Sequence, residues 1–183
     1  MPWRNGAGTT TEIAVFPPGA GFDEFRWRLA IADLDRPGPF SSFPGIDRLL
    51  MLLPPGRATL TINGQEHRLA PLQVLPFRGE AVVSVALATG PARDLNLMTR
   101  RAEAVAVMEA IELGRPALRE LRGGQALVCA IEGAVEVECE GATVLLEPLD
   151  SALCDPPADA VATVSLRPRT APATLAWVTI RPP

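Results

Sequence analysis

The sequence predicts an all-β protein made of two small barrels, and three observations support this fold class. The chain of 183 residues contains 19 prolines and 15 glycines, which interrupt it every few residues. The stretches between them are short and rich in Val, Leu, Ile and Thr, which is the composition of β-strands. The spacing of the turn residues also repeats once along the chain, as a duplicated barrel requires.

Several stretches have the length and apolar content that strands need. The Asn63-Gly64 pair between two of them is a strong hairpin signal, because both turn positions tolerate positive φ. Glu140-Gly141 is its counterpart in the second half. The expected strands are Arg26–Ala32, Arg48–Leu53, Ala58–Ile62, His67–Leu69, Ala81–Leu87, Ala126–Ile131, Ala134–Cys139, Thr143–Leu146, Ala160–Leu166 and Thr174–Ile180.

The repeat relates the two halves without a gap. Apolar positions keep the same register, so that Leu60 falls on Val137. Residues 102–113 join the halves and alternate with period two, which favours a strand although Glu and Ala favour a helix. We therefore expect one domain over residues 1–101 and a second over residues 102–183. The matching turn residues, each pair 77 positions apart, are Gly56 and Gly133, Gly64 and Gly141, and Pro71 and Pro148.

Composition excludes several function classes. The net charge of −4 and a pI near 5.1 argue against nucleic acid or an anionic membrane as a partner, since both need clustered cations. The three cysteines show no C-x-x-C spacing, and the single histidine, His67, cannot form a His-rich metal site. There is no apolar leader and no apolar run of transmembrane length. These features predict a cytoplasmic protein without a metal or other cofactor.

The polar segment Pro2–Glu12 has the composition of a small-molecule pocket. It combines an aromatic ring, a cation, an amide, hydroxyls and a carboxylate with two glycines. Glycine allows the backbone to approach a bound group closely, and the polar side chains supply donors and acceptors. A solvated N-terminal arm is the alternative. The candidate ligand-binding residues in this segment are Trp3, Arg4, Asn5, Thr10 and Glu12.

A second segment, Gly38–Arg48, is a loop with two aromatic residues that leads into a strand. Because neighbouring residues of a strand point to opposite faces, Asp47 and Arg48 cannot both face one cavity if the strand is regular. One of them, with Phe43 as an apolar wall, is expected at the mouth of the barrel. The alternative is a turn closed by a surface charge.

Two more stretches carry candidate binding residues. Residues 93–101 alternate with period two, which puts Asp94 and Asn96 on one face, toward either the barrel interior or solvent. In residues 25–31, Arg28 lies on the face opposite Trp27. The planar guanidinium of Arg28 suits bidentate recognition of a ligand carboxylate. No sequence motif for catalysis accompanies these residues: the chain has no nucleophile elbow, P-loop or dinucleotide fingerprint.

Several of these segments together resemble the HutD/Ves family. The resemblance covers the whole chain in order, with the diagnostic residues in the first half. The family opening is usually Pro-Trp-Lys-Asn-Gly-Gly-Gly, so Arg4 and Ala7 depart from it. Family members usually carry a short strand before this motif, so we expect that the start codon has been assigned too late. The matching segments are Pro2–Thr10 with Glu12, Phe25–Ala32, Gly38–Ser41 continuing to Arg48, Pro76–Gly79, and Asp94–Met98 with Arg100 and Arg101.

The resemblance implies a bicupin, with two RmlC-like jelly-roll barrels in one chain. It also implies a non-catalytic protein of histidine utilisation that binds a small anionic metabolite, such as urocanate or formylglutamate, and moderates pathway expression. Trp3 and Phe43 would supply apolar walls, and Arg4, Arg28 or Arg48 would hold the carboxylate. The other candidate residues, which would orient the ligand, are Asn5, Thr10, Glu12, Asp47, Asp94 and Asn96.

Two other functions stay open at this stage. The first is a metal-independent isomerase, epimerase or lyase on the same scaffold, with Glu12 or an aspartate as base. The second is an interaction module, in which the second barrel forms a homodimer and binds a regulator or an enzyme. The polar motifs all belong to the first half, so the second half is expected to serve as a scaffold or as the dimer-forming half.

Overall fold

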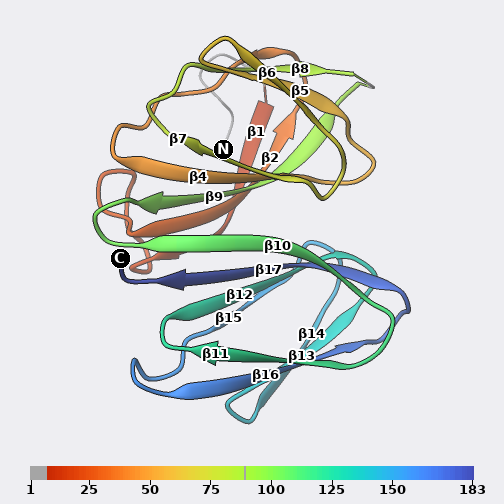
Figure 1. The fold of residues 1–183 in the computed structure, drawn as a ribbon. Helices are drawn as coiled ribbons and strands as arrows, with labels where there is room; N and C mark the ends of the chain where they lie inside the picture. The colour runs from red at the N-terminus through yellow and green to blue at the C-terminus, as the bar shows by residue number, and fades with distance from the viewer. Residues whose placement is uncertain (1–7, 89) are drawn as a thin grey trace. The chain divides into compact units, whose positions relative to one another are not determined.

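The computed structural model describes residues 8–88 and 90–183, and every regular element in them is a β-strand (Figure 1). The all-β prediction is therefore confirmed. The chain divides into two compact units, the first running through Ala104 and the second covering Val105–Pro182. The sequence placed the boundary after Arg101. Among the described residues, none forms a helix that could cross a membrane.

The first unit contains two antiparallel sheets (Figure 1). Leucine, valine and alanine side chains from both sheets, with Leu60 and Leu50 fully buried, form an apolar cluster between them. One sheet has the order β1 (Gly8–Phe16), β2 (Trp27–Leu34), β9 (Ala92–Arg100), β4 (Ile46–Leu52) and β7 (Val74–Arg78). The other has the order β3 (Gly38–Pro39), β8 (Val83–Leu87), β5 (Ala58–Ile62) and β6 (Gln65–Leu69).

The second unit repeats this arrangement with two four-stranded antiparallel sheets. Its core contains aliphatic residues from both sheets together with Trp177 and Cys154, and Cys139 packs against it. The first sheet has the order β10 (Val105–Leu113), β17 (Ala173–Arg181), β12 (Gln125–Glu132) and β15 (Ser151–Cys154). The second has the order β11 (Ala117–Arg122), β16 (Val161–Pro168), β13 (Val135–Cys139) and β14 (Ala142–Leu146).

Both predicted hairpins are confirmed. Asn63 and Gly64 have φ values of 49° and 86° in the β5–β6 turn, and Glu140 and Gly141 have 50° and 78° in the β13–β14 turn. Positive φ at both positions matches the right-handed twist of the flanking strands. The repeat extends to the next turn, because the residues after Pro71 and Pro148 also have positive φ, 67° and 76°.

The structure has more strands than the sequence predicted. Residues 102–113 contain β10, so the favoured strand assignment is confirmed. Strand β1 was not expected, because its Thr-rich, Glu-containing sequence lacks the apolar alternation of a half-buried strand. Strand β7 contains Pro76 and lies at a sheet edge, where a missing N–H is tolerated. Strands β11 and β15 were also missed, because β11 has three charged residues among its six and β15 is only four residues long.

Replacing Leu60 with alanine is expected to lower the free energy of unfolding by about 2–5 kcal/mol, because the side chain is fully buried between the two sheets of the first unit. Urea unfolding midpoints measure this loss. Val82→Ala is the matched control, since Val82 is 80% exposed and its truncation should change stability by less than about 0.5 kcal/mol. Equal losses in the two variants would contradict this account of the core.

Candidate ligand-binding site in the first unit

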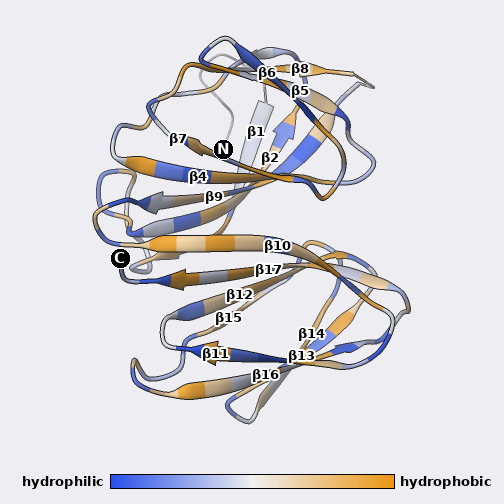
Figure 2. Ribbon diagram, viewed as in Figure 1, coloured by the Kyte–Doolittle hydropathy of each residue, from blue (hydrophilic) through white to orange (hydrophobic). Residues whose placement is uncertain are grey.

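The five-stranded sheet of the first unit carries a band of polar residues on its inner face. The strand register places Arg28, Arg48 and Met98 side by side across β2, β9 and β4. Two residues farther along the strands, the same face carries Glu12, which lies opposite Ala30, and Asn96, which lies between Ala30 and Leu50. The hydrophilic segment near the start of β4, an otherwise apolar strand, is visible in Figure 2. Two residues farther along each strand, the cross-strand neighbours on the same face are Thr10, Ala32, Asp94 and Leu52.

Arg48 is 5% exposed and lies among aromatic rings. Its Cζ atom is 4.9 Å from the ring centroid of Phe77, 5.2 Å from that of Phe40 and 5.8 Å from that of Phe43. Its Nε donates a hydrogen bond of 3.4 Å to Oδ1 of Asn96. Cation–π contacts of this kind hold a guanidinium in place where little water reaches it.

Burial lowers the pKa of Arg48 to about 10, because desolvation disfavours the charged form. The nearby Asp94 opposes this shift, and the positive charge of Arg28 adds to it. Arg48 nevertheless remains a cation at neutral pH. It forms no ion pair with any carboxylate in the described part of the chain.

Arg28 differs from Arg48 because it already has a counter-ion. Its Nε donates to Oε2 of Glu12 at 2.7 Å, between a guanidinium side chain that is 8% exposed and a carboxylate side chain that is 46% exposed. The guanidinium also lies 4.9 Å from the ring centroid of Phe22. The register shift between Glu12 and Ala14 on β1 keeps Glu12 opposite Ala30 and puts Val15 opposite Arg28.

Asp94 is fully buried, and neither of its carboxylate oxygens has a partner with good hydrogen-bond geometry among the residues that the structure describes; the Asn96 side chain acts on it only as a weak donor. Burial raises the pKa of Asp94 to about 7, while Arg48 and the neighbouring Asn96 oppose this shift. Asp33 adds to it by repulsion. A carboxyl group with a pKa near 7 exchanges a proton with solvent in the neutral range.

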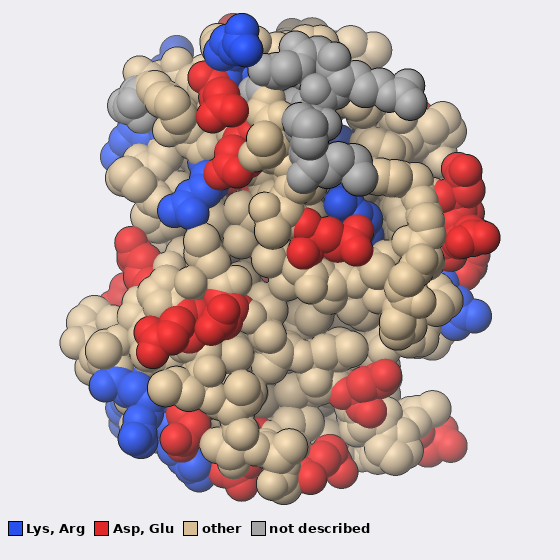
Figure 3. Space-filling view, turned by 180° about the vertical axis from the view of Figure 1, so that it is seen from behind, with Lys and Arg blue, Asp and Glu red and all other residues tan. Residues whose placement is uncertain are grey.

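Asp47 points away from this band, as the alternation rule predicts for a residue next to Arg48. Its Oδ1 accepts hydrogen bonds from Nη1 of Arg78 at 3.0 Å and from Nε of Arg101 at 2.8 Å. Arg101 also contacts Glu80 at 3.0 Å. Asp47 therefore belongs to an ion-pair network on the outer surface and does not join the inner band. Figure 3 shows acidic and basic side chains interspersed on one face of the molecule.

The structure brings together seven of the residues that the sequence singled out. Trp3, Arg4 and Asn5 lie outside the described residues, and Asp47 faces outward. Sequence reasoning missed the aromatic partners Phe22, Phe40 and Phe77. A signal for them was available, since all six phenylalanines of the chain occur within its first 77 residues. The seven residues are Thr10, Glu12, Arg28, Phe43, Arg48, Asp94 and Asn96.

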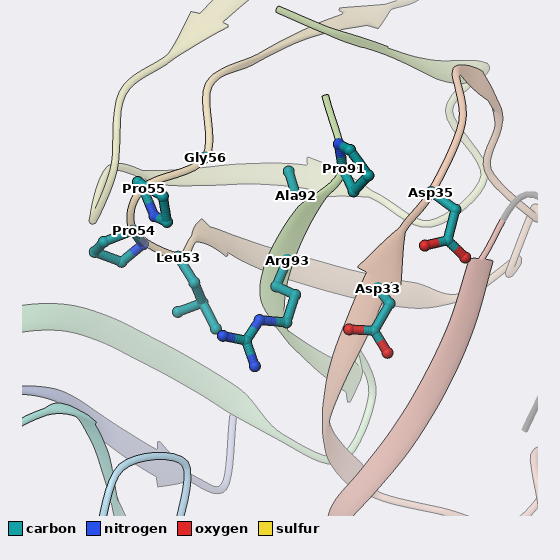
Figure 4. Close-up of a pocket in the computed structure, with 9 residues that line it drawn as sticks. All are labelled: Asp33, Asp35, Leu53, Pro54, Pro55, Gly56, Pro91, Ala92 and Arg93. Carbon is teal, nitrogen blue, oxygen red and sulfur yellow. The ribbon is translucent and has the colours of Figure 1, made fainter. Parts of the chain in front are cut away.

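A surface pocket of about 260 Å³ lies at the other end of the same strands (Figure 4). Asp33, Asp35 and Arg93 contribute the charged groups, and Leu53–Gly56 and Pro91 contribute most of the apolar lining. Oδ2 of Asp33 already accepts a hydrogen bond of 2.8 Å from the Thr9 hydroxyl. The pocket contains none of the buried polar side chains described above, so it is a weaker candidate than the inner band.

The described residues contain no group of three or more His, Cys, Asp or Glu side chains that could hold a metal ion. His67 lies on β6, at the edge of the other sheet of the first unit. The inner band itself contributes arginine, amide and carboxyl groups, whose interactions are charge-assisted hydrogen bonds.

The HutD family model matches residues 1–171. The chain belongs to the HutD family. Two curated relatives match it over about half its length. Protein Ves from Citrobacter koseri is 45% identical over 101 residues, 54% of this chain and 52% of the relative. An uncharacterised 21.2 kDa protein of the hutC 3′ region of Pseudomonas putida is 43% identical over 99 residues, again 54% and 52%. The matched part thus spans about half the length of each relative.

Two solved structures match over nearly the whole chain. A conserved protein of unknown function from Pseudomonas aeruginosa PAO1 has a TM-score of 0.90 at 30% identity, covering 99% of this chain and 93% of its own. HutD from Pseudomonas fluorescens SBW25, in a formate condition, has a TM-score of 0.83 at 29% identity, covering 100% and 93%.

A more distant match establishes the fold alone. A cupin 2 conserved barrel domain protein from Leptotrichia buccalis has a TM-score of 0.62 at 11% identity and covers 95% of this chain and 89% of its own. The bicupin prediction for this HutD-family chain is confirmed, because each unit has the paired sheets of a jelly roll.

Proposed function

We propose that the first barrel binds a small carboxylate and that Arg48 is the cation that holds it. One observation carries this proposal. Arg48 is a buried cation without a carboxylate partner among the described residues, whereas Arg28 is paired with Glu12. A buried charge is normally paired, because transfer from water to a protein interior is costly. A ligand carboxylate would supply the missing partner.

The surroundings of Arg48 favour such a complex. Phe40, Phe43 and Phe77 keep the guanidinium away from bulk water, so a charge-assisted hydrogen bond to it is stronger than on the surface. Asn96 accepts a hydrogen bond from Nε of Arg48, and no described residue accepts one from the two other nitrogens of the guanidinium, which can donate to a ligand. In this proposal Trp3, Arg4 and Asn5 complete the site, and Thr10 and Glu12 help to orient the ligand.

We assign the ligand to histidine utilisation on family grounds. One relative is encoded in the hutC 3′ region of Pseudomonas putida, and the structural neighbour from Pseudomonas fluorescens is a HutD protein. Urocanate and formylglutamate are the proposed ligands, since both carry the carboxylate that Arg48 would bind. Ligand occupancy would then moderate expression of the pathway.

Thermal shift against urocanate, formylglutamate, glutamate, histidine and formate tests the proposal, because a ligand that binds only the folded state raises Tm with concentration. Histamine is the matched control, since it lacks the carboxylate of histidine. We expect a concentration-dependent rise with at least one carboxylate and none with histamine. No rise with any carboxylate, in protein shown to be folded, would overturn the proposal and favour a partner-binding role. Turnover of a ligand that Glu12→Gln abolishes would favour an enzyme.

A further inference from the structure

Among the residues that the structure describes, four charged side chains lie in the inner band of the first barrel, and their charges balance in only one protonation state. Arg28 and Glu12 form an ion pair of 2.7 Å and cancel each other. Arg48 and Asp94 remain. When Asp94 is ionised, these four side chains have no net charge; when Asp94 is protonated, they carry one uncompensated positive charge, on Arg48.

The geometry favours the protonated form of Asp94 in the free protein. Arg48 directs its guanidinium at three phenylalanine rings and forms no ion pair with Asp94, although both are described residues. Neither Asp94 oxygen has a partner with good hydrogen-bond geometry among the described residues, and the Asn96 side chain is the only described amide that acts on the carboxyl group as a weak donor. An ionised carboxylate without partners in an interior would be strongly penalised. Burial raises the pKa of Asp94 to about 7, in agreement with this geometry.

Few other charged groups act on Asp94. The opposite sheet faces it with aliphatic residues of β5, β6 and β8, such as Leu60 and Val85. A ligand carboxylate at Arg48 would therefore be a new negative charge close to Asp94, in a place where little water screens it. The groups that act on Asp94 are Arg48 on β4, Asn96 on β9 and Asp33 on β2. The same face of the sheet also carries Thr10 on β1, at the same step as Asp94, and Glu12 on β1 and Arg28 on β2, farther along the strands.

We propose that Asp94 and the ligand carboxylate are alternative counter-ions of Arg48, so that a small carboxylate binds together with one proton from solvent, which Asp94 retains. This inference rests on the proposed function. The protonated Asp94 carries an O–H donor, which can hydrogen-bond to an oxygen of the ligand. Ionised Asp94 would instead repel the ligand carboxylate and would itself be the counter-ion of Arg48.

Binding of formate and of formylglutamate at pH 6 and pH 8.5 tests this coupling, because both probes stay ionised over this range. We expect the affinity of the wild-type protein to be about thirtyfold lower at pH 8.5, since affinity falls by up to tenfold per pH unit above a pKa of about 7. Titration calorimetry in two buffers of different ionisation enthalpy should show uptake approaching one proton at pH 8.5.

Asp94→Asn keeps a neutral donor at this position and should bind about equally at both pH values, without proton uptake. Asp47→Asn, which changes an outward-facing carboxylate of β4, is the control and should keep the wild-type pH dependence. Wild-type affinity that is constant from pH 6 to pH 8.5, or an Asp94→Asn variant that keeps the pH dependence, would overturn the coupling alone. Failure of the wild-type protein to bind either probe at both pH values would overturn the proposed function itself.

Discussion

Between pH 5 and pH 8 the wild-type protein is expected to lose about 2–3 kcal/mol of stability relative to an Asp94→Asn variant. Burial raises the pKa of Asp94 from its ordinary value of 3.8 to about 7 in the folded protein. Between these two values the folded state holds a proton that the unfolded chain releases, so stability falls as pH rises. Above pH 7 both states are ionised, and the loss levels off. Asparagine does not titrate, so the stability of the variant does not fall with pH through this group.

Chemical denaturation of both proteins at several pH values measures the difference. The comparison is made at each pH, because the introduced asparagine has a burial cost of its own that does not depend on pH. Asp47→Asn serves as the control, since the Asp47 side chain is 40% exposed and is screened by water. A difference between wild type and Asp94→Asn that stays constant from pH 5 to pH 8 would show that Asp94 does not titrate in the neutral range.

Replacing Arg48 with methionine is expected to weaken carboxylate binding by about a hundredfold, or about 3 kcal/mol, because it removes the buried cation that the ligand would pair with. Methionine fills a similar volume and packs well against aromatic rings, so the contacts to Phe40, Phe43 and Phe77 are retained in part. Asp94 can remain protonated in this variant. The fold should therefore survive the change.

Titration calorimetry at pH 6 with urocanate and formylglutamate measures the loss. Arg68→Met is the matched control, because Arg68 is exposed on β6 and its substitution should leave affinity unchanged. A melting curve separates loss of binding from loss of the fold. Wild-type affinity in a folded Arg48→Met variant would exclude Arg48 as the anchor of the ligand.

Local rules predicted most of the fold. Asn-Gly and Glu-Gly turns have the same backbone requirement in both halves, so the hairpins and the 77-residue repeat could be found from turn chemistry alone. Strand alternation also separated Asp47 from Arg48 correctly. Strand β1 was missed because its sequence is polar. It forms a strand through its backbone hydrogen bonds to β2, and this pairing depends on tertiary structure and not on local sequence.

The electrostatics of the candidate site could not be predicted in the same way. Which arginine has a counter-ion depends on the register of β1 against β2, including a shift after Glu12 that no local signal marks. The sequence therefore offered no reason to prefer Arg28 or Arg48 as the cation that holds the ligand carboxylate. For Asp94, alternation left the barrel interior and solvent equally open. Its burial depends on the second sheet, whose strands are distant along the chain.

The most direct test of carboxylate binding at Arg48 is a two-dimensional NMR spectrum of the arginine Nε–Hε groups, recorded while urocanate or formylglutamate is added. The Arg48→Met and Arg68→Met variants assign the two signals. Our account predicts that the Arg48 signal shifts saturably with ligand, while the signal of exposed Arg68 stays in place. Saturable shifts elsewhere in the protein with an unchanged Arg48 signal would contradict it.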